Sequence, residues 1–248
     1  MASGQNPVNK ILSSKWTKAT LFVLALTPLA YLFWRGFHAD LTANPIEYIT
    51  HYTGDWTIRF LLITLSVTPL RLLFNRPQLT RFRRMLGLYA FFYGMLHFTV
   101  WIWLDKNFDL GEMWTDIWKR RFITVGMLGL AMMVPLAVTS TAGWVRRLGY
   151  VRWQRLHRLV YFSSAAGTIH YYWLVKSDIR LPLMYMTILA MLLIRRIPLW
   201  IKSAKPKRAV SRQPSAVSQA PAVSGRNSSS GPIGEREKLK AEGLKAEG

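Results

Sequence analysis

Residues 85–104 read MLGLYAFFYGMLHFTVWIWL, a run of twenty residues without a charged side chain. At about 1.5 Å per residue, a helix of this length spans about 30 Å, which is the thickness of the hydrocarbon core of a bilayer. The run contains His97, and an ionisable ring at membrane depth is costly and usually functional. Residues 85–104 therefore predict a transmembrane helix that carries a functional histidine.

Further apolar runs extend this prediction along the chain. Arg, Trp and Tyr residues flank the shorter runs, and these side chains reach the membrane interface from within a span. With the flanks included, we expect six spans, at about 19–37, 56–74, 85–104, 122–139, 153–175 and 181–200. The predicted fold class is all-α, a polytopic membrane protein built as a six-transmembrane-helix bundle.

Composition divides the chain into three parts. Residues 1–18 are polar and basic and should form a cytoplasmic N-terminal segment, and residues 19–202 should form the transmembrane domain. Residues 203–248 are rich in Ser, Ala, Pro, Lys and Glu and lack aromatic residues, which predicts a disordered cytoplasmic tail. The chain has no cysteine, which excludes disulfides, iron–sulfur clusters, covalent c-type haem and thiolate zinc sites.

The basic residues indicate the orientation of the bundle. The formal net charge is +21, and most Lys and Arg residues lie in the N-terminal segment, the 75–84 turn, the 140–152 loop and the tail. Cytoplasmic loops carry an excess of Lys and Arg, so we expect both termini to be cytoplasmic. Every acidic residue before position 235 falls on the opposite side. Loop position explains the positive charge, and we expect no nucleic-acid partner.

Two histidines are predicted to lie at one depth. The third and fifth spans both run outward, and His97 lies 13 residues past Arg84, just as His170 lies 13 residues past His157. Each step is about 20 Å along a helix, so both rings should reach the outer half of the bilayer. Two imidazoles from facing helices suit the two axial positions of a b-type haem. We therefore predict His97 and His170 as the ligands of a haem iron.

Two glycines support this pair. Gly94 lies three residues before His97, and Gly167 lies three residues before His170. Helical side chains lean over the preceding turn, so both histidines would have a missing side chain where a porphyrin edge needs room. Glycine is also frequent in membrane helices because it allows close packing, and that alternative stays open.

His157 lies near the cytoplasmic edge, with Arg83 and Arg84 at the matching depth of the third span. Three roles fit His157: a ligand of a second haem with an unusual partner, part of a flavin or quinone site, or an interfacial residue bonded to a headgroup. Four arginines could pair with haem propionates or a flavin phosphate, although positive-inside charge also explains each of them. They are Arg83, Arg84, Arg155 and Arg158.

Several motifs occur together in the order typical of one family. They are Thr53-Gly54-Asp55-Trp56, Val67-Thr68-Pro69-Leu70-Arg71, Arg84-Met85-Leu86-Gly87-Leu88, Leu96-His97, Arg146-Arg147-Leu148-Gly149, Trp153-Gln154-Arg155-Leu156-His157-Arg158-Leu159-Val160-Tyr161 and His170-Tyr171-Tyr172-Trp173. Over about residues 20–200 the chain resembles the MsrQ family, also called YedZ. This family belongs to the ferric-reductase-like transmembrane group, in which NADPH oxidases are distant relatives.

The resemblance implies a role as electron donor in the bacterial inner membrane. MsrQ-like proteins take electrons from the quinone pool or a cytoplasmic flavin reductase. They pass them to MsrP, a periplasmic molybdopterin enzyme that reduces methionine sulfoxide in proteins. The family is associated with b-type haem and FMN, and its haem histidines correspond to His97, His157 and His170. The oxidase relatives carry a further histidine 14 residues earlier on the third span, where this chain has Arg83.

We therefore expect electron transfer through one or two b-type haems to a periplasmic partner, with membrane lipid and quinone as further contacts. The acidic loops 38–55 and 105–118 are the expected docking surfaces, and no catalytic constellation appears in the chain. Two alternatives belong to the same broad class: a cytochrome b561-like quinol oxidoreductase and a membrane ferric reductase. A proton-coupled transporter, with the histidines as a proton relay, is the alternative from another class.

Overall fold

The computed structural model describes residues 7–38 and 40–196, and within these ranges the regular elements are helices and no strand occurs. The described helices are α1 (Pro7–Ser13), α2 (Lys15–Phe37), α3 (Pro45–Leu73), η1 (Pro77–Leu79), α4 (Thr80–Val100), η2 (Trp101–Asp105), α5 (Leu110–Lys119), α6 (Arg121–Val138), α7 (Ala142–Leu148), α8 (Tyr150–Leu156), α9 (Leu159–Leu174) and α10 (Arg180–Ile194). The predicted tail, 203–248, lies outside the described residues, as do 197–200 of the last predicted span.

Among the described residues, four helical segments are long and apolar enough to cross a membrane: α2, α3, the continuous segment Pro77–Asp105 and α6. These four correspond to the first four predicted spans. The helices at the fifth and sixth predicted spans are shorter, with 16 residues in α9 and 15 in α10. The all-helical fold class is confirmed for the described residues. Because a perpendicular crossing takes about 20 residues, the number of six spans stays a prediction.

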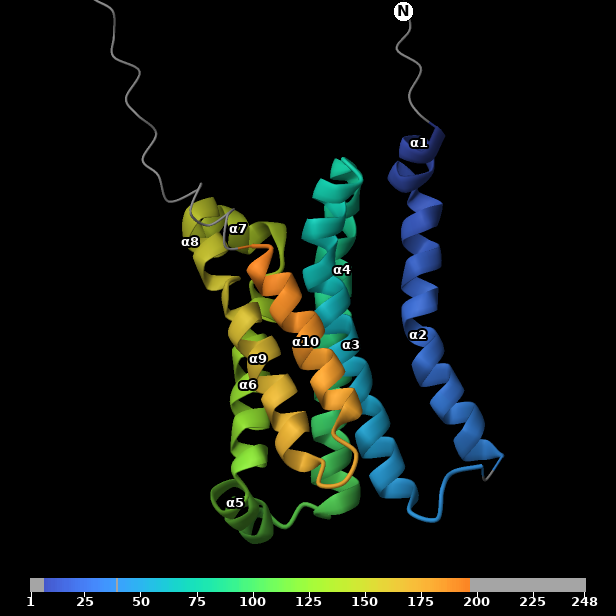
Figure 1. Ribbon diagram of the computed structural model, residues 1–248, viewed down its shortest axis with the longest axis vertical. Helices are drawn as coiled ribbons and strands as arrows, with labels where there is room; N and C mark the ends of the chain where they lie inside the picture. Colours follow the sequence, from blue (N-terminus) through green and yellow to red (C-terminus); the bar gives the residue numbers. More distant parts are fainter. Residues whose placement is uncertain (1–6, 39, 197–248) are drawn as a thin grey trace, which may run out of the picture. The chain divides into compact units, whose positions relative to one another are not determined.

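Two helix pairs form the centre of the bundle. Helix α3 packs along α4, and α6 packs along α9, while α4 also contacts α6 and α10 covers both α9 and α3 (Figure 1). Helix α2 is tied to α4 by tyrosine hydroxyls: Tyr89 donates to the Phe22 carbonyl at 2.9 Å, and Tyr93 donates to the Ala25 carbonyl at 3.0 Å. The four helices α3, α4, α6 and α9 therefore enclose the interior in which a site can form.

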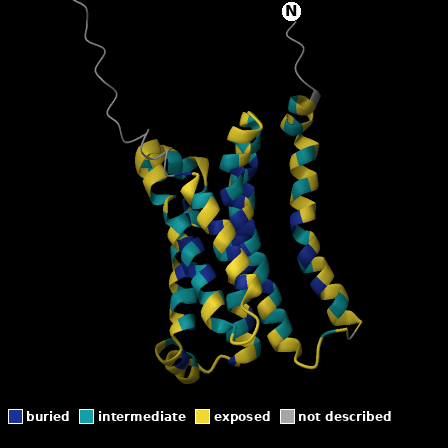
Figure 2. Cartoon of the chain, in the orientation of Figure 1, coloured by how far each residue is buried: buried dark blue, intermediate teal, exposed yellow. Residues whose placement is uncertain are grey.

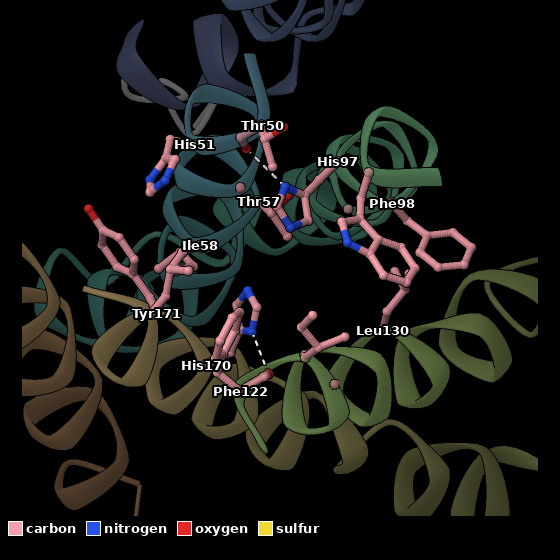
Figure 3. Close-up of a pocket in the computed structure, with 18 of the residues that line it drawn as sticks. Thr50, His51, Thr57, Ile58, His97, Phe98, Phe122, Leu130, His170 and Tyr171 are labelled. Atoms are coloured by element: carbon pink, nitrogen blue, oxygen red, sulfur yellow. Dashed lines mark hydrogen bonds between the residues drawn. The ribbon is translucent and has the colours of Figure 1, made fainter. Parts of the chain in front are cut away.

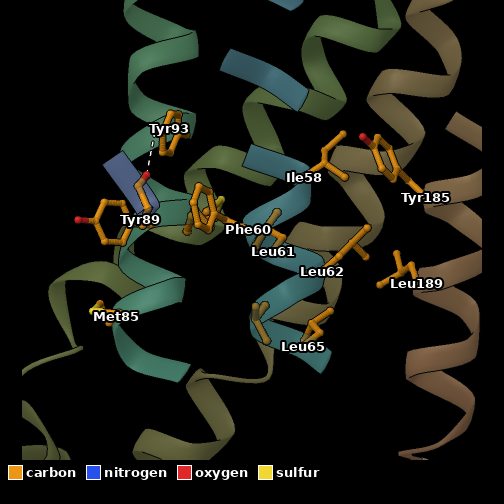
Figure 4. Packing of buried hydrophobic residues seen from close by; sticks show 14 of the residues in the cluster. Ile58, Phe60, Leu61, Leu62, Leu65, Met85, Tyr89, Tyr93, Tyr185 and Leu189 are labelled. Carbon is orange, nitrogen blue, oxygen red and sulfur yellow. Dashed lines mark hydrogen bonds between the residues drawn. The ribbon is translucent and has the colours of Figure 1, made fainter. Parts of the chain in front are cut away.

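Aromatic residues fill the contact between α3 and α4. The Phe60 ring stacks on Tyr93 with centroids 5.2 Å apart and on Tyr89 with centroids 5.7 Å apart (Figure 4). Leu65 and Tyr93 have no exposed surface in this cluster. Such close packing fixes the rotation of α4 about its axis, and that rotation decides which way His97 points.

Large apolar side chains also cover the outside of the bundle. Exposed residues follow the outward faces of α2, α6 and α10 (Figure 2), among them Phe33, Leu128 and Met191. A protein in water rarely exposes apolar surface of this extent. The outward faces are therefore those of a protein surrounded by lipid.

The structure corrects several expected boundaries. Residues 45–55 were expected in a loop, but α3 already begins at Pro45. Asn44 caps this helix by accepting a hydrogen bond from the Glu47 amide, with proline at the first helical position. Polar first turns carry little hydropathy, so the apolar run alone placed the start too late. The expected loops 105–121 and 140–152 likewise contain α5 and α7.

The fifth predicted span is not one continuous helix. Helix α8 ends at Leu156, His157 is its C-terminal cap, and α9 begins at Leu159. The interruption falls within the predicted span 153–175. His157 and His170 therefore lie on either side of a break in the helix, and their relative directions do not follow from an ideal helical period.

Candidate functional site

The four central helices enclose a cavity of about 550 Å³. Its lining is mainly apolar and includes Leu61, Leu130 and Met133. Polar residues line the cavity where α3 and α6 begin and η2 ends. They are Asn44, Glu47, His51, Asp55, Asp105 and Arg120. Ligand sites are typically cavities of about 300–1,000 Å³ with apolar walls and few polar groups, and this cavity has that character.

His97 on α4 and His170 on α9 both line the cavity, with their rings facing each other across it (Figure 3). The ring centroids are 6.1 Å apart and the ring planes are inclined by 76°. The sequence predicted that these two rings share a depth, and the structure brings them together as neighbours.

Each imidazole is held from behind by a backbone carbonyl. The Nδ1 atom of His97 lies 2.9 Å from the Thr50 carbonyl, and that of His170 lies 2.6 Å from the Phe122 carbonyl. A carbonyl oxygen only accepts, so Nδ1 carries the proton in both rings. In a neutral imidazole the lone pair is then on Nε2. This arrangement orients a metal-ligating histidine and raises its basicity.

The separation of the two rings fits a single metal ion between them. A metal–imidazole bond is about 2.0 Å long and the ring centroid lies about 1.1 Å behind the ligating nitrogen, so two opposed imidazoles have centroids about 6.2 Å apart. The observed separation is 6.1 Å. The apolar walls would also accept a flat hydrophobic macrocycle, so His97 and His170 are the residues that would hold a haem iron.

Two glycines that sequence reasoning missed lie against these rings. A Cβ atom on Gly126 of α6 would be 2.7 Å from Nδ1 of His170, and a Cβ on Gly54 of α3 would be 3.2 Å from Nδ1 of His97. Both contacts cross between helices, so no spacing within one helix could have revealed them. Gly54 nevertheless lies in the Thr53–Trp56 motif, which was a signal for its position.

Gly94 and Gly167 line the cavity as well. A Cβ on Gly167 would meet only the Ile58 side chain, at 4.0 Å, whereas a Cβ on Gly94 would meet Leu130 at 3.2 Å and Thr57 at 3.4 Å. The space beside Gly167 is thus open, as a porphyrin edge requires. The space beside Gly94 is occupied by neighbouring helices, in keeping with the packing alternative.

His157 lies away from this cavity and is absent from its lining. Its Nε2 atom is 3.2 Å from the Thr139 hydroxyl, and its ring packs against Trp153 with centroids 4.1 Å apart and planes inclined by 33°. Among the described residues no group of three His, Cys, Asp or Glu side chains could hold a metal ion. His157 therefore lies apart from the pair His97 and His170, and its role as a haem ligand or in a separate site stays a prediction.

The predicted arginines are also outside the cavity lining. Arg83 and Arg84 lie in the first turns of α4, Arg155 lies near the end of α8, and Arg158 lies at the break before α9. None of the four lines the cavity, whereas Arg120, among the described residues, does. Their pairing with propionates or a flavin phosphate stays a prediction.

The fold and the site together define a helical membrane bundle with two facing imidazoles in its interior. The family described as "Ferric reductase like transmembrane component" matches residues 21–168. This match begins within α2 and ends within α9, two residues before His170. Together with the apolar helices, it shows that the chain is a multi-pass membrane protein.

Similar proteins narrow this class. A relative from Herminiimonas arsenicoxydans is 51% identical over 182 residues, which are 73% of this chain and 84% of the relative. One from Caulobacter vibrioides is 46% identical, covering 71% of this chain and 84% of the relative. One from Rhodospirillum rubrum is 47% identical, covering 78% of this chain and 93% of the relative. Each is named protein-methionine-sulfoxide reductase heme-binding subunit MsrQ. The chain belongs to the MsrQ family.

Proposed function

We propose that this chain is the haem-binding membrane subunit of a protein-methionine-sulfoxide reductase system and moves electrons across the bacterial inner membrane. The observation that carries the proposal is the pair His97 and His170, with ring centroids 6.1 Å apart in an apolar cavity. The names of the relatives support the same assignment, because each is a heme-binding subunit.

The residues of the chain have three tasks in this proposal. His97 and His170 would hold the haem iron, and the carbonyls of Thr50 and Phe122 hold the two imidazole rings in place. The apolar walls exclude water and lower the local dielectric constant. When bound, b-type haem supplies one-electron oxidation and reduction, while axial ligation and burial set its potential.

In this proposal the chain crosses the membrane six times, with both termini in the cytoplasm. Electrons move from the cytoplasmic side toward the periplasm. Electrons enter from the quinol pool or from a cytoplasmic flavin reductase, with FMN as a further cofactor. They leave to a periplasmic molybdopterin enzyme of the MsrP kind, which reduces oxidised methionine in proteins. Acidic residues at the open end of the cavity, including Glu47 and Asp105, provide a docking surface for that enzyme.

Haem content of the purified protein tests the proposal. We expect a Soret band that shifts on reduction with dithionite, and loss of most of this signal in His97→Ala and in His170→Ala. His38→Ala is the matched control, because His38 is exposed at the end of α2 and outside the cavity. If both variants keep a normal low-spin spectrum, the ligand assignment is wrong. A colourless preparation from haem-replete cells would favour the transporter.

A second measurement tests whether His157 belongs to a haem site of its own. Haem and iron are quantified per chain in the wild type and in His157→Ala. Because His157 does not line the cavity, we expect His157→Ala to keep the signal of the His97–His170 pair. Loss of one of two haems in this variant would assign His157 to a second site. Loss of all haem would contradict the separation of the two sites.

A further inference from the structure

Helix α5 presents its two faces in an unusual way. Its apolar residues Leu110, Trp114 and Trp118 follow one face and are 75%, 64% and 69% exposed. The opposite face carries Glu112 and Asp116, and the Asp116 side chain is 10% exposed. An amphipathic helix on a protein in water buries its apolar face and exposes its polar face. Helix α5 does the reverse at Asp116.

A buried lysine holds the polar face of α5 inward. Lys106, just after η2, is 5% exposed. Its Nζ atom lies 2.7 Å from Asp116, 2.6 Å from Glu112 and 3.6 Å from Asp105. Asp116 also pairs with Arg120 at 3.2 Å. A buried cation with carboxylates around it is costly to separate, so these bonds fix the rotation of α5 and turn its tryptophans away from the bundle.

The turn before α5 sets its direction. Asn107 and Phe108 both have left-handed backbone, with φ of 44° and 61°, a conformation that bulky residues rarely adopt. The Phe108 amide donates to the Ile102 carbonyl at 3.0 Å, and Asp109 caps α5 by accepting from the Gly111 and Glu112 amides. Figure 1 draws α5 nearly end-on at the lower end of the upright α6, so its axis runs across that of α6.

The position of α5 between two membrane spans identifies what covers its apolar face. Spans end at Asp105 and begin at Arg121, on either side of α5, so the helix lies at the level of the membrane surface. Trp is enriched at that level. Lys119, Arg120 and Arg121 follow the apolar face directly, and cations next to an apolar face suit anionic headgroups.

We propose that α5 is an interfacial helix, lying along the membrane surface with Leu110, Trp114 and Trp118 inserted between the lipid headgroups. The ion pairs of Lys106 hold it in this orientation. Two residues of the same cluster, Asp105 and Arg120, line the cavity that contains His97 and His170. The rim of the cavity is thereby attached to the membrane surface. This inference does not depend on which group the cavity binds.

The absence of cysteine from the chain makes a direct test possible. A nitroxide spin label is attached to the single cysteine of Leu110→Cys, a variant that keeps both tryptophans. The matched control is Thr115→Cys, on the same helix but about 140° around its axis; Thr115 is also exposed. Each full-length protein is placed singly in nanodiscs of phosphatidylethanolamine and phosphatidylglycerol, and elution as a single monodisperse peak confirms folding.

Relaxation of the label by oxygen and by a water-soluble nickel complex gives the result. Oxygen concentrates in lipid and the nickel complex stays in water. We expect the ratio of oxygen to nickel accessibility to be several-fold higher for the label at position 110 than at position 115. Equal ratios, with both labels open to nickel, would overturn the proposal. In a disc with one chain, an apolar face that normally binds a protein partner would be open to water. Equal ratios would therefore assign the apolar face of α5 to a protein partner.

Discussion

The contact between Gly126 and His170 shows how little freedom the site leaves to single residues. The His170 ring packs against one turn of α6, where its Nδ1 atom lies near both the Phe122 carbonyl and Gly126. Any side chain at position 126 must displace the ring or the helix. The hydrogen bond at 2.6 Å then lengthens, and the ring loses its orientation toward His97.

Gly126→Ala tests this contact. The new Cβ would be 2.7 Å from Nδ1 and 3.0 Å from Cε1 of His170, and overpacking of this kind costs about 1–3 kcal/mol. We expect a clear fall in haem bound per chain, measured as the pyridine haemochrome. The control is Gly36→Ala in α2, where a Cβ would meet nothing within 4 Å. Normal haem content in Gly126→Ala would show that the ring position tolerates displacement.

At the scale of an element, α5 depends on one lysine. Burial alone would lower the pKa of Lys106, but hydrogen bonds to Asp116 and Glu112 and the charge of Asp105 outweigh burial and raise this pKa above its usual value. A raised lysine pKa means a contribution to stability that is complete below the unfolded pKa of about 10.4. It is lost only as pH rises through the folded pKa.

Lys106→Met should therefore destabilise the protein by about 3 kcal/mol, because it leaves the buried Asp116 carboxylate without its closest cation. The fall in melting temperature should be the same at pH 7 and pH 9, since Lys106 stays charged across this range. Lys119→Met removes the same charge from an exposed position and should change the melting temperature little. Equal melting temperatures of the two variants would contradict a structural role for Lys106.

At the scale of the whole molecule, the sequence predicted those features of the fold that long apolar runs determine. The helical class, the first four spans and the proximity of His97 and His170 followed from run lengths and from counting along two helices. The start of α3 at Pro45, the break at His157 and the contacts of Gly54 and Gly126 did not. Polar caps, helix breaks and contacts between helices depend on tertiary neighbours, which hydropathy along one chain does not contain.

The orientation of the bundle is a further prediction at this scale. Two single-cysteine variants, Ala142→Cys and Ser177→Cys, test it. Position 142 is in the basic 140–152 loop, and position 177 is between α9 and α10 on the acidic side. Both positions are exposed and each change is small. In spheroplasts, a membrane-impermeant maleimide should label Ser177→Cys directly and Ala142→Cys only after permeabilisation. The reverse pattern would place the termini in the periplasm.

The break before α9 has a consequence for the surrounding bilayer. With 16 and 15 residues, α9 and α10 are only about 24 Å and 22 Å long, shorter than a hydrocarbon core of about 30 Å. If both helices cross the membrane as predicted, this hydrophobic mismatch would be relieved by local thinning of the bilayer or by flanking side chains that reach the headgroups. The chain is therefore expected to be most stable in thin membranes. Under the proposed electron-transfer function, the insulating layer on the side of α9 that carries His170 would be correspondingly narrow.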